Sequence, residues 1–258
     1  MVDVLPFCEA LRERTASRPS DAGCDFMTDL LVGRGTRDDY VQLLAQHYFV
    51  YEALEAAGER HEGDPVAARF LSPALTRLPA IRSDLAFLLG DDWRSRIAPL
   101  PTTAEYVRRI EDVAGGWVGG FVAHHYTRCL GDLSGGHLIR TVLQRRFGFD
   151  TNGVGFFLFA EIADPKGFKA TYRQQLDAVD WTDAERDRVI DEVLVAYRYC
   201  TALFADLAAA KAAGDGAGVT GAGAEDAGAA GAGVAGAAGA PAPVGAPHAS
   251  GRLGVPAA

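Results

Sequence analysis

The chain has 258 residues and a formal net charge of −9. This acidic balance argues against a nucleic-acid-binding protein, because binding to phosphates requires a basic surface. Its four cysteines form no CxxC pair, which indicates neither a disulfide framework nor a zinc site and favours a reducing cytoplasm. The N-terminus lacks the pattern of a signal peptide. Without a charge-free run of about 20 apolar residues, we expect no membrane span.

The chain divides into two parts of different composition. From Ala208 onward the sequence consists almost entirely of Ala, Gly, Pro and Val, with no aromatic residue. Such a segment buries too little apolar surface to offset the entropy lost on ordering. We therefore predict a folded domain over residues 1–207 and a disordered low-complexity tail over residues 208–258.

The first predicted element is an amphipathic helix with a fault in it. Apolar residues recur at helical spacing through residues 11–31, but Pro19 interrupts the run and Gly23 follows. Proline inside a helix removes a backbone hydrogen bond and clashes with the preceding turn, at a cost of roughly 3 kcal/mol. The presence of a proline at position 19 therefore requires a structural or functional explanation.

Helical periodicity predicts the rest of the domain. The predicted helical segments span 37–60, 64–90, 102–148, 164–181 and 182–207. Pro73 and Pro79 divide the second segment into one or two short helices, and a break near Gly115 divides the third. Thr182 and Glu185 match a capping box at the start of the last helix. Because sustained alternation of period two is lacking, we predict an all-α domain.

The segment AHHYTRCLGDLSGGHLIR, residues 123–140, combines helical flanks with three glycines. Each of Gly131, Gly135 and Gly136 costs about 1 kcal/mol relative to alanine, and together they predict a kink. One explanation is close helix–helix packing. The other is a flat ligand lying against the backbone, with Asp132 beside it. The glycines alone favour packing.

The longer motif favours the ligand. AHHYTRCLGDLSGGH, residues 123–137, resembles the heme oxygenase signature AHxYTRxLGDLSGG. The resemblance covers most of residues 5–207, including FMTDLL at 26–31, KGFKATYR at 166–173 and ALFADL at 202–207. It implies a helical domain that holds heme between an N-terminal helix and the glycine-rich distal helix. Such a domain oxidises heme to biliverdin with O₂ and electrons from a reductase or ferredoxin, and releases CO and ferrous iron. The membrane anchor of microsomal members is missing from this sequence, as in soluble bacterial ones.

The resemblance also implies roles for individual residues. Gly131, Gly135 and Gly136 let the distal backbone approach the macrocycle, and Asp132 holds a water molecule that supplies hydrogen bonds during oxygen activation. Tyr51 and Arg128 match positions that extend this hydrogen-bond network. The family usually has asparagine where Cys200 stands, which predicts a weakened branch of the network.

A second set of residues matches heme-contact positions. The expected contacts are Arg12, Met27, Tyr126, Lys169 and Arg173. Basic side chains suit the two heme propionates, because guanidinium and ammonium groups form charge-assisted hydrogen bonds with carboxylates. Without the motif, each of these cations would be interpreted as a solvated surface charge. Basic residues in an acidic protein also suggest an acidic electron donor that docks near the heme edge.

The proximal iron ligand is the point of departure from the family. There, the N-terminal helix supplies a histidine four residues after the threonine matched by Thr15, in a pattern close to HSDAE. This chain reads PSDAG at residues 19–23, so Pro19 stands at the ligand position and Gly23 replaces the glutamate that orients it. An alternative register places Arg18 there. Neither residue is a plausible iron ligand.

Three hypotheses remain open at this point. The first is an active heme oxygenase whose iron is held through water or another donor, such as Cys24 or a histidine. The second is a heme-binding or carrier protein that has lost turnover. The third is a helical domain without a heme function.

Overall fold

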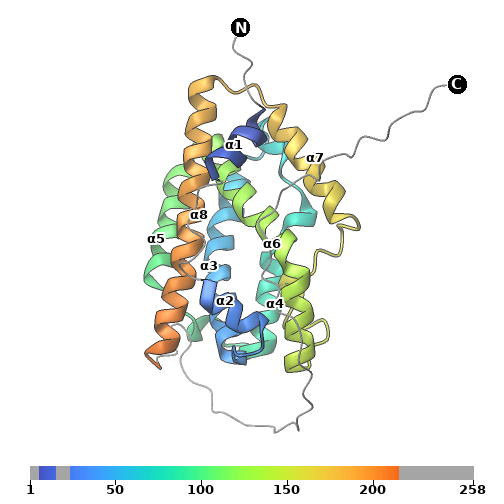
Figure 1. Ribbon diagram of the computed structural model, residues 1–258, viewed down its shortest axis with the longest axis vertical. Coiled ribbons are helices and arrows are strands. Elements are labelled where there is room, and N and C mark those ends of the chain that lie inside the picture. The colour runs from blue at the N-terminus through green and yellow to red at the C-terminus, as the bar shows by residue number, and fades with distance from the viewer. Residues whose placement is uncertain (1–5, 16–23, 215–258) are drawn as a thin grey trace, which may run out of the picture. The chain divides into compact units, whose positions relative to one another are not determined.

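The computed structural model describes residues 6–15 and 24–214 (Figure 1). These residues form an all-α structure without a β-strand. The α-helices are α1 (Phe7–Thr15), α2 (Cys24–Leu31), α3 (Arg37–Arg60), α4 (Leu78–Leu89), α5 (Pro101–Arg109), α6 (Val118–Phe147), α7 (Pro165–Asp177) and α8 (Asp183–Ala212). Short 3₁₀ turns are η1 (Ala67–Arg69), η2 (Pro73–Leu75), η3 (Trp93–Arg96) and η5 (Gly155–Phe157), and η4 (Ile110–Ala114) is a π turn. The fold class predicted from the sequence is confirmed.

Helix α3 is the central element of the core. It begins at a capping box, in which the Asp39 N–H donates to Thr36 Oγ1 at 3.0 Å and the Thr36 N–H donates to Asp39 Oδ2 at 2.7 Å. Tyr40, Leu44 and Tyr51 on this helix are all buried. The predicted bounds, 37–60, are those observed.

Proline positions explain how the next segments end and begin. Of the one or two helices predicted over 64–90, the structure has one α-helix, α4, preceded by two 3₁₀ turns. Pro73 opens η2, and Pro79 lies in the first turn of α4, where a missing N–H removes no helical bond. The break predicted near Gly115 is confirmed, since η4 ends at Ala114 and α6 begins at Val118.

Asp84 on α4 fixes the loop that leads to α7. Its carboxylate accepts the backbone N–H groups of Gly153, Gly155 and Phe156 at 2.8, 3.0 and 2.7 Å. This arrangement holds η5, and with it Phe156 and Phe157, against α3 and α6. Phe156 makes an edge contact with Tyr51, with ring centroids 5.4 Å apart.

Helix α6 continues through the glycine-rich segment. The three glycines predict a kink, and they do not end the helix, since α-helical structure is unbroken from Val118 to Phe147. Figure 1 shows this helix changing direction along its length without a break. A glycine lowers helix propensity without removing a hydrogen bond, so packing against neighbours is enough to keep the helix formed.

Helix α8 begins where the sequence predicts and extends further than the predicted domain end at 207. Thr182 accepts the N–H of Glu185 at 3.2 Å, whereas the Glu185 carboxylate accepts the indole N–H of Trp117. At the other end, Lys211 Nζ lies 2.9 Å from Asp39 Oδ2 and 3.6 Å from Asp29 Oδ2. Residues 208–212 therefore belong to a helix that contacts the core. Residues 215–258 lie outside the described residues.

By length and composition, α8 is the one helix in the described segments that would suffice to span a membrane. Here it packs against α5 and α6, and its carboxylates are bonded to other elements. Asp206 accepts the backbone N–H of Thr102 at 2.8 Å. We therefore interpret α8 as a core helix.

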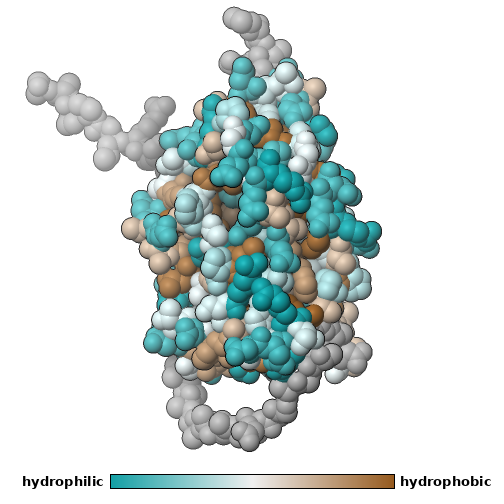
Figure 2. All heavy atoms as spheres, turned by 180° about the vertical axis from the view of Figure 1, so that it is seen from behind, coloured by the Kyte–Doolittle hydropathy of each residue, from teal (hydrophilic) through white to brown (hydrophobic). Residues whose placement is uncertain are grey.

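Figure 2 shows one face of the molecule, on which hydrophilic and hydrophobic residues are interspersed.

Candidate functional site

The site is built around Asp132, whose carboxylate is held by α3 and α6 together. Arg128, one turn earlier on α6, donates from one terminal nitrogen to Asp132 Oδ2 at 2.7 Å and to Oδ1 at 3.0 Å. The Tyr51 hydroxyl donates to Oδ2 at 2.6 Å. Arg128, Asp132 and Tyr51, which the family resemblance assigns to one network, are therefore in direct contact.

Burial gives these contacts their strength. The side chains of Arg128 and Asp132 are 8% and 14% exposed, and Tyr51 is fully buried. Burial, reinforced by the Asp132 charge, raises the pKa of Tyr51 well above its usual value. Burial, the largest single influence, would lower the pKa of Arg128, but the Asp132 carboxylate and the other acidic groups around it together outweigh burial and raise that pKa. Tyr51 is therefore a neutral donor, and Arg128 remains a cation.

The Arg128 guanidinium also contacts the thiol at the position where the family has asparagine. Its second terminal nitrogen donates to Cys200 Sγ at 3.3 Å. Sulfur is a weak acceptor, so this branch is present with a weaker partner than an amide oxygen. Arg128 Nε is buried and has no hydrogen-bond partner among the described residues.

The three glycines of the motif have different surroundings. A Cβ added at Gly131 would meet no atom within 4 Å, and one at Gly135 would meet only Ile139, at 3.9 Å. A Cβ at Gly136 would lie 3.1 Å from the ring of Phe157. Gly131 and Gly135 therefore leave an open strip of helix backbone beside Asp132, which fits a flat ligand. Gly136 serves the packing of η5 on α6.

The predicted basic residues lie on α7 and α1. Lys169 Nζ donates to Ser134 Oγ at 3.0 Å, which places it beside the glycine segment of α6. Burial and the neighbouring Arg173 lower the pKa of Lys169. Burial is the main reason that the pKa of Tyr126 rises to about 12, and the nearby positive charge of Arg173 partly opposes this rise. Lys169, Arg173 and Tyr126 therefore form one group at the α6–α7 contact.

Two expected contacts come from the N-terminal helices. Arg12 on α1 is exposed and lies 3.8 Å from Glu9. Its helix is joined to α7 by the backbone N–H of Cys8, which donates to Asp177 Oδ1 at 2.8 Å. Met27 on α2 is partly buried and packs against the core.

The proximal side of the predicted site lies outside the described residues. Arg18, Pro19 and Gly23 all fall between α1 and α2, in residues 16–23. Within the described ranges, no group of three or more His, Cys, Asp or Glu side chains has the geometry of a metal site. The identity of the iron ligand therefore stays open.

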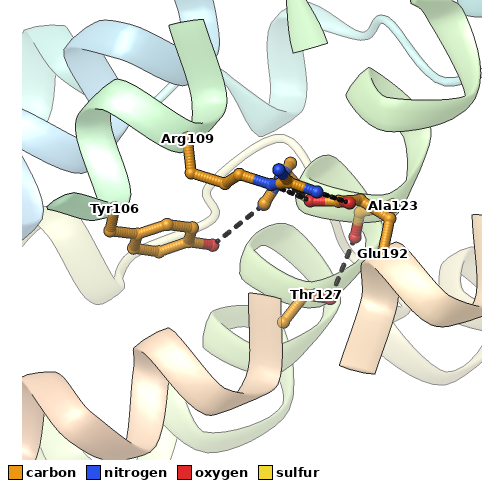
Figure 3. A network of polar contacts seen from close by, with 6 residues as sticks. Tyr106, Arg109, Ala123, Thr127 and Glu192 are labelled. Carbon is orange, nitrogen blue, oxygen red and sulfur yellow. Dashed lines mark hydrogen bonds and ion pairs between the residues drawn. The ribbon is translucent and has the colours of Figure 1, made fainter. Parts of the chain in front are cut away.

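Sequence reasoning missed a second polar cluster next to the first. It contains Tyr106 and Arg109 of α5 and Glu192 of α8, which Figure 3 labels, and His124 of α6. His124 Nε2 lies 3.0 Å from Glu192 Oε1, and Arg109 Nε donates to the same oxygen at 2.9 Å. A signal was available, because Glu192 lies on the buried stripe of α8 that contains Val189, Val193 and Ala196. A carboxylate on such a stripe requires a buried partner.

Comparisons with known proteins agree with this geometry. The family model described as heme oxygenase matches residues 5–206. Heme oxygenase 1 of Nostoc sp. is 34% identical over 183 residues, which cover 70% of this chain and 77% of that protein. Human heme oxygenase 1 is 37% identical over 203 residues, which cover 77% of this chain and 70% of that protein.

Solved structures show the same fold. Heme oxygenase-1 of Synechocystis sp. in complex with heme has a TM-score of 0.73 and 32% identity, covering 81% of this chain and 96% of that one. Heme oxygenase of Leptospira interrogans has a TM-score of 0.71 and 29% identity, covering 78% of this chain and all of that one. The motif, the Asp132 network and these similarities agree. The chain belongs to the heme oxygenase family, whose enzymes degrade heme to biliverdin.

Proposed function

We propose that this protein carries out the family reaction at the α6 site, with Asp132 as its central catalytic residue. The observation that carries this proposal is the position of an anchored carboxylate beside the open backbone of Gly131 and Gly135. Heme, when bound, supplies the iron at which O₂ is activated and the ring that is oxidised. The residues of the chain bind this substrate, limit the space around it and move protons.

Asp132 is suited to holding one water molecule. A carboxylate offers about four acceptor positions, and three of them are used by the two Arg128 contacts and Tyr51. The remaining position, on Oδ1, is available to accept a hydrogen bond from water. Because the carboxylate is fixed at both oxygens, such a water would be held in a defined orientation, as proton delivery requires.

Gly131 and Gly135 set the shape of the site. Their open strip would allow the flat face of the substrate to lie close to the α6 backbone, with room only for a small ligand between them. Any side chain at these positions would occupy that space. This interpretation explains why glycines are present where the helix itself does not need them.

Lys169 and Arg173 of α7, with Arg12 of α1, are proposed to bind the propionates. Burial and the neighbouring positive charge of Arg173 lower the pKa of Lys169, and bound carboxylates would partly neutralise that charge. Tyr126 and Met27 are proposed as contacts with the heme edge. The same cationic surface would suit an acidic ferredoxin or flavin reductase as electron donor, in the cytoplasm.

A heme titration followed by a turnover assay tests this function. We expect a Soret shift on binding, and biliverdin once O₂, a ferredoxin, its reductase and NADPH are supplied. Asp132→Ala should retain heme binding and lower turnover by on the order of 10²-fold, in the range usual for a positioned proton donor. The exposed Asp91→Ala is the matched control and should retain full turnover.

Two results would contradict the proposal in different ways. An unchanged heme spectrum would remove any heme function from this chain. Binding without biliverdin in the native chain, together with turnover in Pro19→His, would identify a heme carrier that lost its proximal ligand. The hypotheses left open at position 19 are therefore separated by a single substitution.

A further inference from the structure

We propose that a cavity between α3, α6 and the segment around η2 is a second ligand site, which binds a small organic cation with a flat apolar body. Its volume is about 600 Å³, within the usual range for small-molecule sites. Tyr51 lines this cavity, whereas its hydroxyl donates to Asp132. Tyr51 therefore lies between the cavity and the Asp132 site. The inference goes beyond the proposed heme reaction and does not depend on it.

The floor of the cavity is apolar, and a glycine keeps it open. Leu54, Leu75 and Phe121 line it and are all buried. Gly58 lies in the last turn of α3, and a Cβ added there would be 3.0 Å from Leu71 Cδ2 and 3.3 Å from Phe121 Cε2. A side chain at position 58 would therefore project between Leu71 and Phe121. Glycine lowers helix propensity, so the space that it leaves explains its presence here.

The floor also holds a buried hydrogen-bond donor. His125 is 6% exposed, and its Nδ1 lies 2.8 Å from the hydroxyl of Tyr172, which is 2% exposed. Among the described residues this hydroxyl has no other partner, so its hydrogen must be directed at Nδ1. Burial lowers the pKa of His125 to about 4, so the ring is neutral and carries its one hydrogen on Nε2. His125 lines the cavity, and no described residue accepts this hydrogen.

Carboxylates supply the other end of the site. Glu59 and Glu62 are exposed at the edge of the cavity, and Glu55 is partly buried. Glu55 Oε1 accepts the backbone N–H groups of Arg77 and Leu78 at 2.6 and 3.0 Å, which fixes this carboxylate at the start of α4. The described residues that line the cavity include no lysine and no arginine. The charge of the lining therefore favours a cation.

These features together define the class of ligand. The apolar floor suits a ring, and the His125 N–H requires an acceptor such as an ether or carbonyl oxygen. The carboxylates require an ammonium or amidinium group. Heme and biliverdin do not meet this description, because their propionates would face Glu55, Glu59 and Glu62. The cavity is therefore distinct from the proposed heme site.

Binding of matched small molecules tests this assignment. The probe is 4-methoxyphenethylamine, which combines a primary ammonium group, a ring and an ether oxygen. Calorimetry with the full-length, heme-free protein should give a dissociation constant of about 0.1–3 mM, as expected for a compound of this size. Phenethylamine lacks the ether oxygen and should bind roughly three- to tenfold more weakly. The anion 3-(4-methoxyphenyl)propionate has a similar shape and should not bind. Equal binding of amine and anion, or no binding of the amine, would overturn the proposal.

Substitutions at the edge and in the floor locate the bound probe. The double variant Glu59→Gln, Glu62→Gln removes two exposed charges and should weaken binding of the amine about two- to tenfold. The exposed Glu105→Gln on α5 is the matched control and should bind like the native protein. Gly58→Leu should fill the floor and weaken binding more than tenfold, with circular dichroism as the check on folding. Native affinity in the double variant would reject the site, whether or not Gly58→Leu folds.

Magnetic resonance tests the donor separately. The ¹⁵N–¹H signals of the His125 ring, identified by their loss in His125→Gln, should show the hydrogen on Nε2 and should shift when the methoxy probe is added. A hydrogen on Nδ1 would overturn the proposal.

The relation to heme is tested by repeating the calorimetry with excess heme. We expect the same affinity for the amine, and displacement by heme would overturn the assignment of a second site. None of these measurements uses turnover, so their failure is distinguishable from failure of the proposed heme reaction.

Discussion

Glycines at different points along α6 serve opposite purposes. In the first half, a Cβ at Gly119 would lie 2.7 Å from Val189, and one at Gly120 would lie 2.9 Å from the Val113 carbonyl oxygen. In the second half, a Cβ at Gly131 would meet nothing. The first pair is needed for the fold itself. Gly131 is not, so its role concerns something that approaches the helix.

Polar residues follow the same division. His124 and His125 of the first half are buried and bonded to Glu192 and Tyr172, so each has a partner within the protein. Asp132, directly after Gly131 in the second half, has a side chain that is 14% exposed and carries the catalytic role proposed above. A glycine or a polar residue on a helix therefore indicates a ligand site only when the folded chain leaves it space. The predictions below test this division.

The largest effect should come from acid, through two buried histidines, His125 of α6 and His47 of α3. Burial lowers the pKa of both His47 and His125 to about 4, compared with 6.5 for an exposed histidine. Between these values the unfolded chain binds protons that the folded chain does not, so stability falls as pH falls. At about 1.4 kcal/mol per pH unit, each histidine accounts for up to about 3 kcal/mol lost by pH 4. Urea titrations from pH 7 to pH 4 measure this loss.

The matched variant is His125→Gln, which cannot titrate in this range. Its stability should depend less steeply on pH than that of the native chain. Equal slopes would mean that His125 is not held neutral by burial.

Gly120→Ala should destabilise the fold. The new methyl group would press on the Val113 carbonyl oxygen of the rigid π turn and on the ring of Trp117. Overpacking of this kind costs about 1–3 kcal/mol. Denaturant unfolding followed by circular dichroism gives the value, and an unchanged midpoint would show that η4 moves aside freely.

Gly131→Ala should stabilise the fold and lower heme turnover. Alanine at an exposed helical position raises stability by about 1 kcal/mol relative to glycine. The same methyl group would occupy the open strip, so heme turnover should fall about tenfold. A variant with higher stability and full turnover would contradict the role of this strip in substrate binding.

Lys169→Ala should give the smallest effect. A partly exposed ammonium group bound to a carboxylate contributes about 0.5–1 kcal/mol, so heme affinity should weaken about two- to fivefold. Lys166→Ala on the same helix is the control, because that residue is exposed and lies in the first turn of α7. Equal losses in both variants would indicate general electrostatic attraction in place of a propionate contact.

Local sequence patterns predicted a helix well where its terminal residues and its apolar face indicated the same bounds. The apolar side of residues 37–60 identified α3, Thr182 marked the start of α8, and Gly115 marked the break before α6. The turns η1 and η2 were harder to predict from the sequence, because a 3₁₀ turn of three residues is too short to show a periodic pattern. The extension of α8 beyond residue 207 depends on Lys211 reaching Asp39, and a contact over such a distance in sequence leaves no local signature.

The site was predicted unevenly for a similar reason. The motif located Asp132, Arg128 and the glycines because they are close together on one helix. Which glycine faces open space, and which one faces Phe157, depends on where η5 lies. The partners of His124 come from α5 and α8, so only the arrangement of three helices identifies them. Position 19, where the resemblance predicts a departure from the family, falls outside the described residues, so the loss of the proximal histidine stays a prediction.

The ion pairs of Lys211 determine where this chain can be shortened. Composition places the domain boundary at residue 207. A protein truncated there would lose Lys211, whose ammonium group pairs with Asp29 of α2 and Asp39 of α3. Asp39 is also the reciprocal partner of Thr36, so the loss would reach the start of the central helix. A protein truncated after Gly214 keeps these ion pairs. Any property of the full-length chain that this shorter protein lacks can then be assigned to residues 215–258.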